Sequence, residues 1–256
     1  MTADKRKNFW VLTVLLVFAL SSSFKQKEIS AQNLCTVKLI FINTIKGSRV
    51  VFNDSSYTNP FGEKYSITKL RYYVTNVSLV NGYAGFKEEN SYHLVDESRV
   101  ESQTISFSIP AGDYNAVQFL LGVDSLHNVS GAQTDDLDPA NDMFWTWNTG
   151  YVMAKLEGNS ASSTAVNNKF EFHVGGFSGK YNVLKPVQLD FPGKTVHFIG
   201  GKTCEIVVNA DINAWWQHPN DIKISEHPII TSPGQFAKLI SDNYANMFRI
   251  EKITPE

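Results

Sequence analysis

Hydrophobic and polar residues alternate along much of this chain, which is the pattern of β-strands with one buried face. Residues 104–109 are the clearest case, because three apolar side chains alternate with Thr and Ser. Residues 67–80 carry apolar side chains on both faces, which predicts a strand buried on both sides or interrupted by a β-bulge. The same reading predicts further strands at 36–42, 91–96, 114–123, 170–174, 187–191, 196–198 and 205–212.

Only the end of the chain has helical spacing. Phe236, Leu239 and Ile240 recur at intervals of about one helical turn. Before them, Ser232 can cap the helix and Pro233 suits its first position. Short strands separated by frequent turns and followed by one helix predict an all-β fold, an antiparallel β-sandwich with a C-terminal α-helix.

Composition agrees with this fold class. The chain has 256 residues, of which 43% are hydrophobic and 19% charged, so it can bury a substantial core and lacks the composition of a disordered protein. Because it has no internal repeats or linkers, we expect residues 33–256 to form a single domain. The formal net charge of −2 argues against nucleic acid as a partner, which would require a basic face.

The first 32 residues have the organisation of a secretory signal peptide. Three basic residues, Lys5, Arg6 and Lys7, precede an apolar run at 11–20, and a polar stretch ending in small residues follows. The apolar run is shorter than the roughly 20 residues that span a bilayer. We therefore expect cleavage near Gln32, no membrane span in the mature chain, and a periplasmic or secreted protein.

The two cysteines of the chain are Cys35 and Cys204. In an oxidising compartment they can form one disulfide, and we predict this pairing. The bond would close a very long loop and stabilise the protein by up to about 5 kcal/mol in the chain-entropy model. The alternative is two buried free thiols.

Enzyme motifs are absent from the sequence. It contains no G-x-S-x-G, no H-E-x-x-H, no phosphate loop and no dinucleotide fingerprint. No pair of carboxylates and no pair of nucleophile and base stands out either. We therefore expect a protein that is not an enzyme, and ligand, carbohydrate or metal binding are the classes that fit an exported β-protein.

Histidines offer the first candidates for metal binding. His173 lies in a predicted strand, shares a face with Glu171, and could bind copper or zinc with a carboxylate beside it. His93 is placed similarly, before Leu94. The alternative for both is a hydrogen-bonded structural histidine. Structural or exposed positions are favoured for the other four, which are His127, His197, His218 and His227.

An acidic loop follows the strand predicted at 114–123. Its Asp124, Asp135, Asp136 and Asp138 supply hard oxygen ligands that could hold calcium. Their spacing does not match an EF-hand, and a solvated loop is the alternative interpretation.

Aromatic residues are concentrated just after this loop, within residues 138–158. Phe144, Trp145, Trp147 and Tyr151 fall within eight residues. Rings at this density form either a packed part of the core or the wall of a binding site.

A set of ordered motifs runs through nearly all of the chain beyond residue 32. With these motifs the sequence resembles the MbnP-like copper-binding proteins, which are exported bacterial β-proteins. The resemblance implies a glycine before the Met-Phe-Trp run, where this chain has Asp142. The motifs are 69–78 (KLRYYVTNVS), 92–96 (YHLVD), 122–125 (GVDS), 128–131 (NVSG), 138–139 (DP), 143–151 (MFWTWNTGY), 155–158 (KLEG), 172–176 (FHVGG) and 237–248.

The resemblance implies a function in copper handling. In members of the family linked to copper uptake, a tryptophan is oxidised to kynurenine by a di-haem partner related to cytochrome c peroxidases, and copper is held by the kynurenine with histidines. Carried over to this chain, Trp145 or Trp147 is the candidate for oxidation, and His173 and then His93 are the candidate ligands. The alternative function is a structural or carbohydrate-binding β-sandwich of the cell envelope without a metal.

Overall fold

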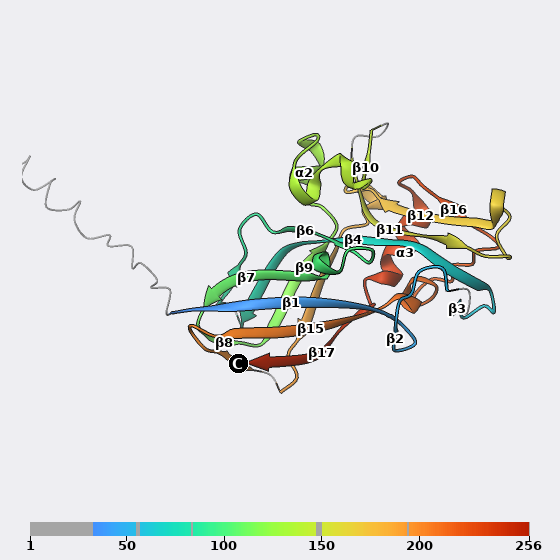
Figure 1. Cartoon of the computed structure of the whole chain (residues 1–256). Coiled ribbons are helices and arrows are strands. Elements are labelled where there is room, and N and C mark those ends of the chain that lie inside the picture. Colours follow the sequence, from blue (N-terminus) through green and yellow to red (C-terminus); the bar gives the residue numbers. More distant parts are fainter. Residues whose placement is uncertain (1–32, 55–56, 83, 147–149, 194, 256) are drawn as a thin grey trace, which may run out of the picture. The chain divides into compact units, whose positions relative to one another are not determined.

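The alternating segments form the strands of two main sheets in a computed structural model (Figure 1). The structure describes residues 33–54, 57–82, 84–146, 150–193 and 195–255. The signal peptide predicted at 1–32 and Trp147 lie outside these residues. The described helices include none that is long and apolar enough to cross a membrane.

The smaller sheet contains the first and last long strands of the described chain. Its central pair, β1 and β15, is parallel, whereas the other pairs are antiparallel. The prediction of a purely antiparallel arrangement is therefore wrong at this pair, because the long intervening chain lets β15 return in the same direction as β1. It is also wrong at a short pair of the larger sheet, where residues 171–172 run parallel to residues 229–230. The order is β17 (Phe248–Pro255), β15 (Thr203–Asp211), β1 (Leu34–Ile45) and β2 (Ser48–Arg49), and β7 (Thr104–Pro110) also pairs with β1.

The larger sheet is built around β4 (Lys64–Asn81), the long strand predicted from residues 67–80. Both of its faces are largely buried, and its pairings shift register between Thr75 and Ser78, so burial on both sides and the β-bulge are both present. The order is β13 (Lys185–Asp190), β9 (Ala116–Leu121), β4, β11 (Gly150–Asn159), β12 (Lys169–Gly175) and β16 (Ile229–Ile230); β3 (Tyr57–Thr58), β5 (Ala84–Lys87) and β6 (Tyr92–Asp96) also pair with β4, and β10 (Phe144–Trp145) pairs with β11.

Aromatic rings connect the two sheets. Phe41 of β1 contacts Tyr72 of β4 and Phe119 of β9 edge to face, with ring centroids 6.2 Å and 5.8 Å apart. Phe248 of β17 contacts the same three rings. The all-β class is confirmed. Of the predicted sandwich, these contacts support one feature, an aromatic core shared by the two sheets.

The end of the chain differs from its prediction in two ways. The helix α3 (Gln235–Tyr244) is present, but Gly234 is its N-cap and no side chain caps it, so Ser232 and Pro233 lie before the helix. After α3 the chain forms β17 rather than ending as a helix. Polar and apolar residues of this segment alternate too irregularly to predict a strand. The segment becomes a strand because it pairs with β15.

Several further elements were not expected from the pattern, including the ten-residue strand β11. The acidic loop contains α2 (Ser125–Val129), η3 (Asp135–Leu137) and η4 (Pro139–Asn141). The strand predicted at 114–123 is divided, because β8 (Gly112–Tyr114) leaves β9 to pair with β14 (Val196–Phe198). Other short elements are η2 (Val100–Gln103), η5 (Val166–Asn168), η6 (Gly179–Tyr181) and η7 (Ile212–Trp215).

The two cysteines lie on the adjacent strands β1 and β15. Both are buried free thiols, so the predicted disulfide is absent from the structure. Cys204 lies across from Val37 and therefore diagonally from Cys35.

Candidate functional site

Trp145 is positioned by a short hairpin and by a glycine. Phe144 and Trp145 form β10, which pairs antiparallel with the start of β11. The indole lies on Gly175 of β12, where a Cβ would be only 2.4 Å from Cζ3 of the ring. Only glycine leaves room for the ring at this position, and the packed Trp145 retains 7% exposure.

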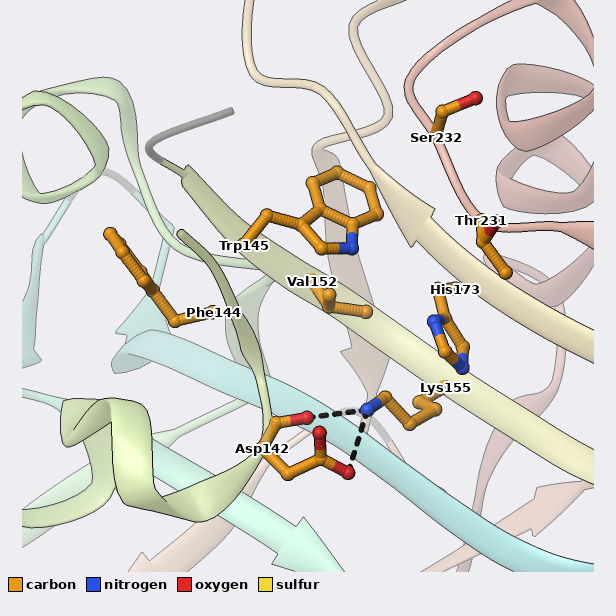
Figure 2. Close-up of a pocket in the computed structure, with 8 residues that line it drawn as sticks. All are labelled: Asp142, Phe144, Trp145, Val152, Lys155, His173, Thr231 and Ser232. Carbon is orange, nitrogen blue, oxygen red and sulfur yellow. Dashed lines mark hydrogen bonds and ion pairs between the residues drawn. The ribbon is translucent and has the colours of Figure 1, made fainter. Parts of the chain in front are cut away.

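Trp145 and His173 line one pocket of about 470 Å³. Figure 2 shows both rings at this pocket, with Lys155 hydrogen-bonded to Asp142 along one side. Thr231, from the segment before α3, contributes to the opposite side. The aromatic stretch is therefore both packed and site-lining, and the structure brings the predicted Trp145 and His173 together.

The register of three strands places the polar side chains of the site on one face. His173 of β12 lies across from Lys155 of β11, which lies across from Arg71 of β4. Residues directly opposite each other in neighbouring strands point to the same side of the sheet. By the same rule Glu157, two residues after Lys155, shares this face.

Lys155 is the central charge of the pocket. Its side chain is 3% exposed, and its Nζ lies 2.5 Å from the Asp142 carbonyl oxygen, 3.0 Å from Asp142 Oδ2 and 4.0 Å from Glu157 Oε1. Burial lowers the pKa of Lys155, and the two carboxylates offset only part of that effect. Burial would raise the pKa of Asp142, but Lys69 and Lys155 outweigh it and lower this pKa to about 2.

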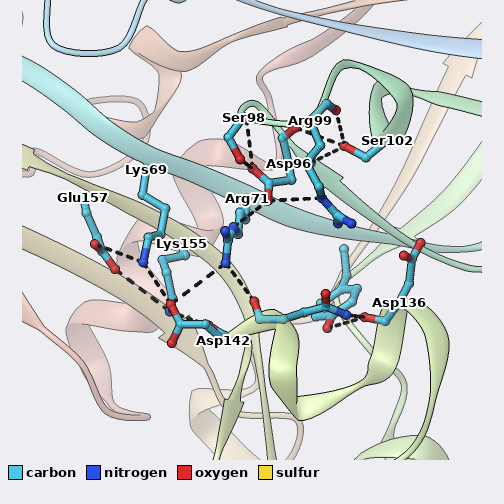
Figure 3. A network of polar contacts seen from close by, with 12 residues as sticks. Lys69, Arg71, Asp96, Ser98, Arg99, Ser102, Asp136, Asp142, Lys155 and Glu157 are labelled. Carbon is cyan, nitrogen blue, oxygen red and sulfur yellow. Dashed lines mark hydrogen bonds and ion pairs between the residues drawn. The ribbon is translucent and has the colours of Figure 1, made fainter.

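The charged network extends from the pocket along the sheet (Figure 3). Lys69 Nζ lies 2.9 Å from Asp142 Oδ2 and 3.6 Å from Glu157 Oε2. Arg71 donates to the carbonyl oxygen of Asn141 at 2.8 Å and forms an ion pair with Asp96. These contacts hold the loop around η4 against the sheet, so the position of Asp142 is well determined by its partners.

His173 has a carboxylate partner on the neighbouring strand β11. Its Nε2 lies 2.8 Å from Glu157 Oε1. Burial would raise the pKa of Glu157, but His173 and Lys69 outweigh it and lower that pKa. The carboxylate was expected beside His173, but it comes from β11 as Glu157 rather than from Glu171 of the same strand.

His93 does not join His173, so that predicted pairing is wrong. On β6, Asp96 lies across from Arg71 and therefore shares the face of His173. His93 is three residues earlier, and side chains alternate along a strand, so it points to the opposite face. There its Nε2 lies 2.9 Å from Glu88 Oε2. A shared ion would require both imidazoles within about 2 Å of one metal.

The four aspartates proposed for calcium make separate contacts. Asp124 and Asp138 cap α2 and η4 respectively, and Asp136 accepts a hydrogen bond from the Leu94 amide. Asp135 accepts one from its neighbour in the chain, Thr134. In the part of the chain that the structure describes, no group of three or more His, Cys, Asp or Glu could hold a metal ion.

Sequence reasoning missed Lys155, Glu157 and Asp142 as site residues. A signal for the first two was present, because they lie two residues apart in a segment that could be read as a strand. Asp142 could not be placed from the sequence. It has a left-handed backbone (φ 56°), a conformation that the expected glycine would adopt without steric cost.

The sequence profile of the MbnP family matches residues 35–232. The chain belongs to the MbnP family. Among solved structures it is similar to MbnP from Methylosinus trichosporium, with 16% sequence identity and a TM-score of 0.51 over 78% of this chain and 81% of that chain. At this identity the structural likeness supports the fold alone. No curated protein matched the chain.

The MbnP match contains the whole pocket described above. The residues that line the pocket extend from Asp142 to Ser232, the last matched residue, whereas α3 and β17 lie beyond the match. The resemblance to MbnP-like proteins, first based on the ordered motifs, is thus confirmed at the level of the family.

Proposed function

We propose that this MbnP-family chain is an exported, non-enzymatic protein that binds copper in the pocket shared by Trp145 and His173. The observation that carries the proposal is their meeting in one pocket, because they come from separate strands and were both candidates from the sequence. A pocket of about 470 Å³ also has ample room for an ion and its water ligands.

The donors in this pocket fit copper in its Cu(II) form. His173 supplies an imidazole nitrogen and Asp142 a carboxylate among the residues that line the pocket, and Glu157 Oε1 lies 2.8 Å from His173 Nε2. No sulfur-bearing side chain is among the described residues that line the pocket. Nitrogen and oxygen donors favour Cu(II), whereas Cu(I) prefers the softer thiolates and thioethers.

Lys155 sets a condition on this proposal. Its ammonium group contacts the same carboxylates that would hold the ion. Two cations cannot occupy this space at low cost, so binding requires the lysine side chain to turn away. Lys155→Met should therefore raise the copper affinity of the pocket, and it keeps most of the apolar length of the side chain.

Copper stoichiometry of the purified mature protein tests the proposal. His173→Gln should lower the bound Cu(II) by one equivalent relative to the wild-type protein. His197→Gln is the matched control, because His197 pairs with Asp113 on the surface, far along the chain from the pocket strands, and is mostly exposed. If His173→Gln bound as much copper as the wild type, His173 would be excluded as a ligand.

We further propose that Trp145 is the tryptophan oxidised to kynurenine, with oxidising equivalents supplied by a di-haem cytochrome c peroxidase-like partner. This proposal is supported by the two-sided accessibility of Trp145, which lines both this pocket and a second pocket of about 590 Å³. Two oxygen atoms from water enter the indole ring as four protons leave and four electrons pass to the partner. Hydrolysis then releases one carbon as formate, so the residue gains one oxygen and loses one carbon overall. Trp147, outside the described residues, is the alternative position.

Peptide mass spectrometry after co-expression with such a partner tests this second step. The peptide with Trp145 should gain the mass of one oxygen less one carbon, and Trp145→Phe should abolish the gain. Trp147→Phe is the control and should retain it. If the mass gain disappeared in Trp147→Phe but remained in Trp145→Phe, the oxidised residue would be Trp147 and not Trp145. If the wild-type protein showed no mass gain, the oxidation step would be rejected.

A further inference from the structure

Tyr92, Asp124 and His127 form a second cluster of metal-binding side chains. Tyr92 is on β6, whereas Asp124 and His127 belong to the N-terminal turn of α2. The Asp124 carboxylate caps α2 by accepting from the His127 amide at 3.1 Å, so the helix turn itself sets where both side chains lie. The cluster shares none of its residues with the pocket of Trp145 and His173.

The donor atoms of these three side chains converge. Tyr92 Oη lies 2.5 Å from Asp124 Oδ2 and 2.6 Å from His127 Nδ1. His127 Nδ1 lies 3.1 Å from Asp124 Oδ1. Around a metal with bonds of 2.0–2.2 Å, neighbouring ligand atoms are about 3 Å apart. The three groups need to separate by only a few tenths of an ångström to accommodate an ion.

Exposure and the charge of Asp124 favour a metal site, whereas burial and the adjacent Asp124 raise the pKa of the Tyr92 phenol, so a bound ion has to displace its proton. The side chains of Asp124 and His127 are 27% and 30% exposed, so water can reach an open coordination position. Burial would raise the pKa of Asp124, but hydrogen bonds from Tyr92 and His127 outweigh it and lower this pKa to about 2. The carboxylate is therefore ionised at neutral pH, and the nearby Asn76 amide contacts it at 3.4 Å without adding charge.

The chemistry of the three donors points to a particular class of ion. One imidazole nitrogen, one carboxylate oxygen and one phenol oxygen form a set that is too nitrogen-rich for calcium and too hard for Cu(I). Among divalent first-row ions, Cu(II) binds such mixed nitrogen and oxygen sites most tightly.

We propose that Tyr92, Asp124 and His127 form a second Cu(II) site, with His127 Nδ1, an Asp124 oxygen and the Tyr92 phenolate as ligands. Binding displaces the phenol proton to solvent, and water completes the coordination. The proposal does not depend on copper binding at His173.

Titration of the His173→Gln protein with CuSO₄ tests the second site in isolation. It should bind one equivalent of Cu(II) and develop a visible phenolate-to-copper charge-transfer band. Tyr92→Phe in the same background should abolish the band and weaken binding by at least the roughly 10–100-fold that even outer-shell partners of a metal contribute. Tyr181→Phe is the matched control, since Tyr181 lies outside the cluster, and it should keep both band and affinity.

Electron paramagnetic resonance of the His173→Gln protein provides a measurement that needs no change to the cluster. Coupling to one imidazole nitrogen is expected. No bound copper, a spectrum with several imidazole nitrogens, or a Tyr92→Phe protein with unchanged band and affinity would overturn the proposal. Failure of the proposed copper site at His173 can be told apart from failure of the second site. In that case the wild-type and His173→Gln proteins would bind the same number of copper equivalents.

Discussion

At the scale of single residues, Gly175 determines where Trp145 can lie. A Cβ at residue 175 would meet Cζ3 and Cη2 of the indole at 2.4 Å and 2.5 Å. We expect Gly175→Ala to displace the ring and to lower the free energy of unfolding by about 1–3 kcal/mol, the usual cost of overpacking. Urea unfolding measures the stability, and tryptophan fluorescence reports the displacement.

The matched control for this variant is Gly234→Ala, because a Cβ at residue 234 meets nothing within 4 Å. It should leave the fluorescence spectrum unchanged. A Gly175→Ala protein with the stability and spectrum of the wild type would contradict the close packing of the indole on β12.

The reactivity of the two cysteines is also decided at the residue scale. Burial raises the pKa of Cys35 and raises that of Cys204 to about 12. Only the thiolate reacts readily with alkylating agents. The native protein should therefore resist iodoacetamide at neutral pH, and the denatured, unreduced protein should take up two equivalents, as counted by mass spectrometry. No uptake after denaturation would contradict the free thiols and indicate a disulfide.

At the scale of elements, Glu63 ties the turn before β4 to the segment before β16. Its buried carboxylate accepts hydrogen bonds from the backbone amides of Ile224 and Ser225 at 2.8 Å and 2.9 Å, and from the Asn59 side chain. Burial would raise the pKa of Glu63, but these hydrogen bonds outweigh it and lower this pKa. The carboxylate therefore stabilises the fold in its ionised form.

The sign of the pH dependence follows from that lowered pKa. The contribution of Glu63 is fully present above the ordinary glutamate pKa of about 4.3 and is lost as the pH falls through the folded-state value. We expect Glu63→Gln to cost about 1.5–3 kcal/mol at pH 7, the range for hydrogen bonds to charged groups. The difference from the wild type should narrow as the pH falls below about 4.

Urea unfolding at a series of pH values measures this effect. Glu205→Gln is the control, since Glu205 is an exposed partner of Lys38 on the surface of β15 and should change stability by less than about 1 kcal/mol. An equal loss in the two variants, or a Glu63→Gln deficit that stays constant down to pH 2, would contradict the role assigned to the buried carboxylate.

At the scale of the whole molecule, Phe248 holds the last strand to both sheets. Its ring contacts Phe41, Tyr72 and Phe119, with centroids 5.9 Å, 5.7 Å and 5.3 Å away. Phe248→Ala should lower the free energy of unfolding by about 3–5 kcal/mol, because it opens a cavity between the sheets. Urea denaturation followed by circular dichroism measures the loss.

Phe236 provides the comparison for Phe248, because it is 38% exposed on α3. Phe236→Ala should cost less than about 1 kcal/mol. Similar losses in the two variants would mean that the aromatic contacts between the sheets contribute little, contrary to the fold described here.

The sequence by itself determined the β class, the family and many of the strands, but not β11 or β17. The clean alternation at 104–109 became β7, and the doubly apolar stretch at 67–80 became the bulged β4. These features are local, because side-chain alternation and β-branching act within a few residues. The histidine and tryptophan candidates were also visible, since His173 and Trp145 stand in recognisable motifs.

Only the tertiary structure decided which of these residues meet. The sequence could not exclude His93, because its face depends on how β6 pairs with β4, and one residue of register reverses every side chain. It could not find the contact of Lys155 with Asp142, or the convergence of Tyr92 with Asp124 and His127. Those contacts join different strands and loops, and strand pairing and loop packing bring them within hydrogen-bond distance.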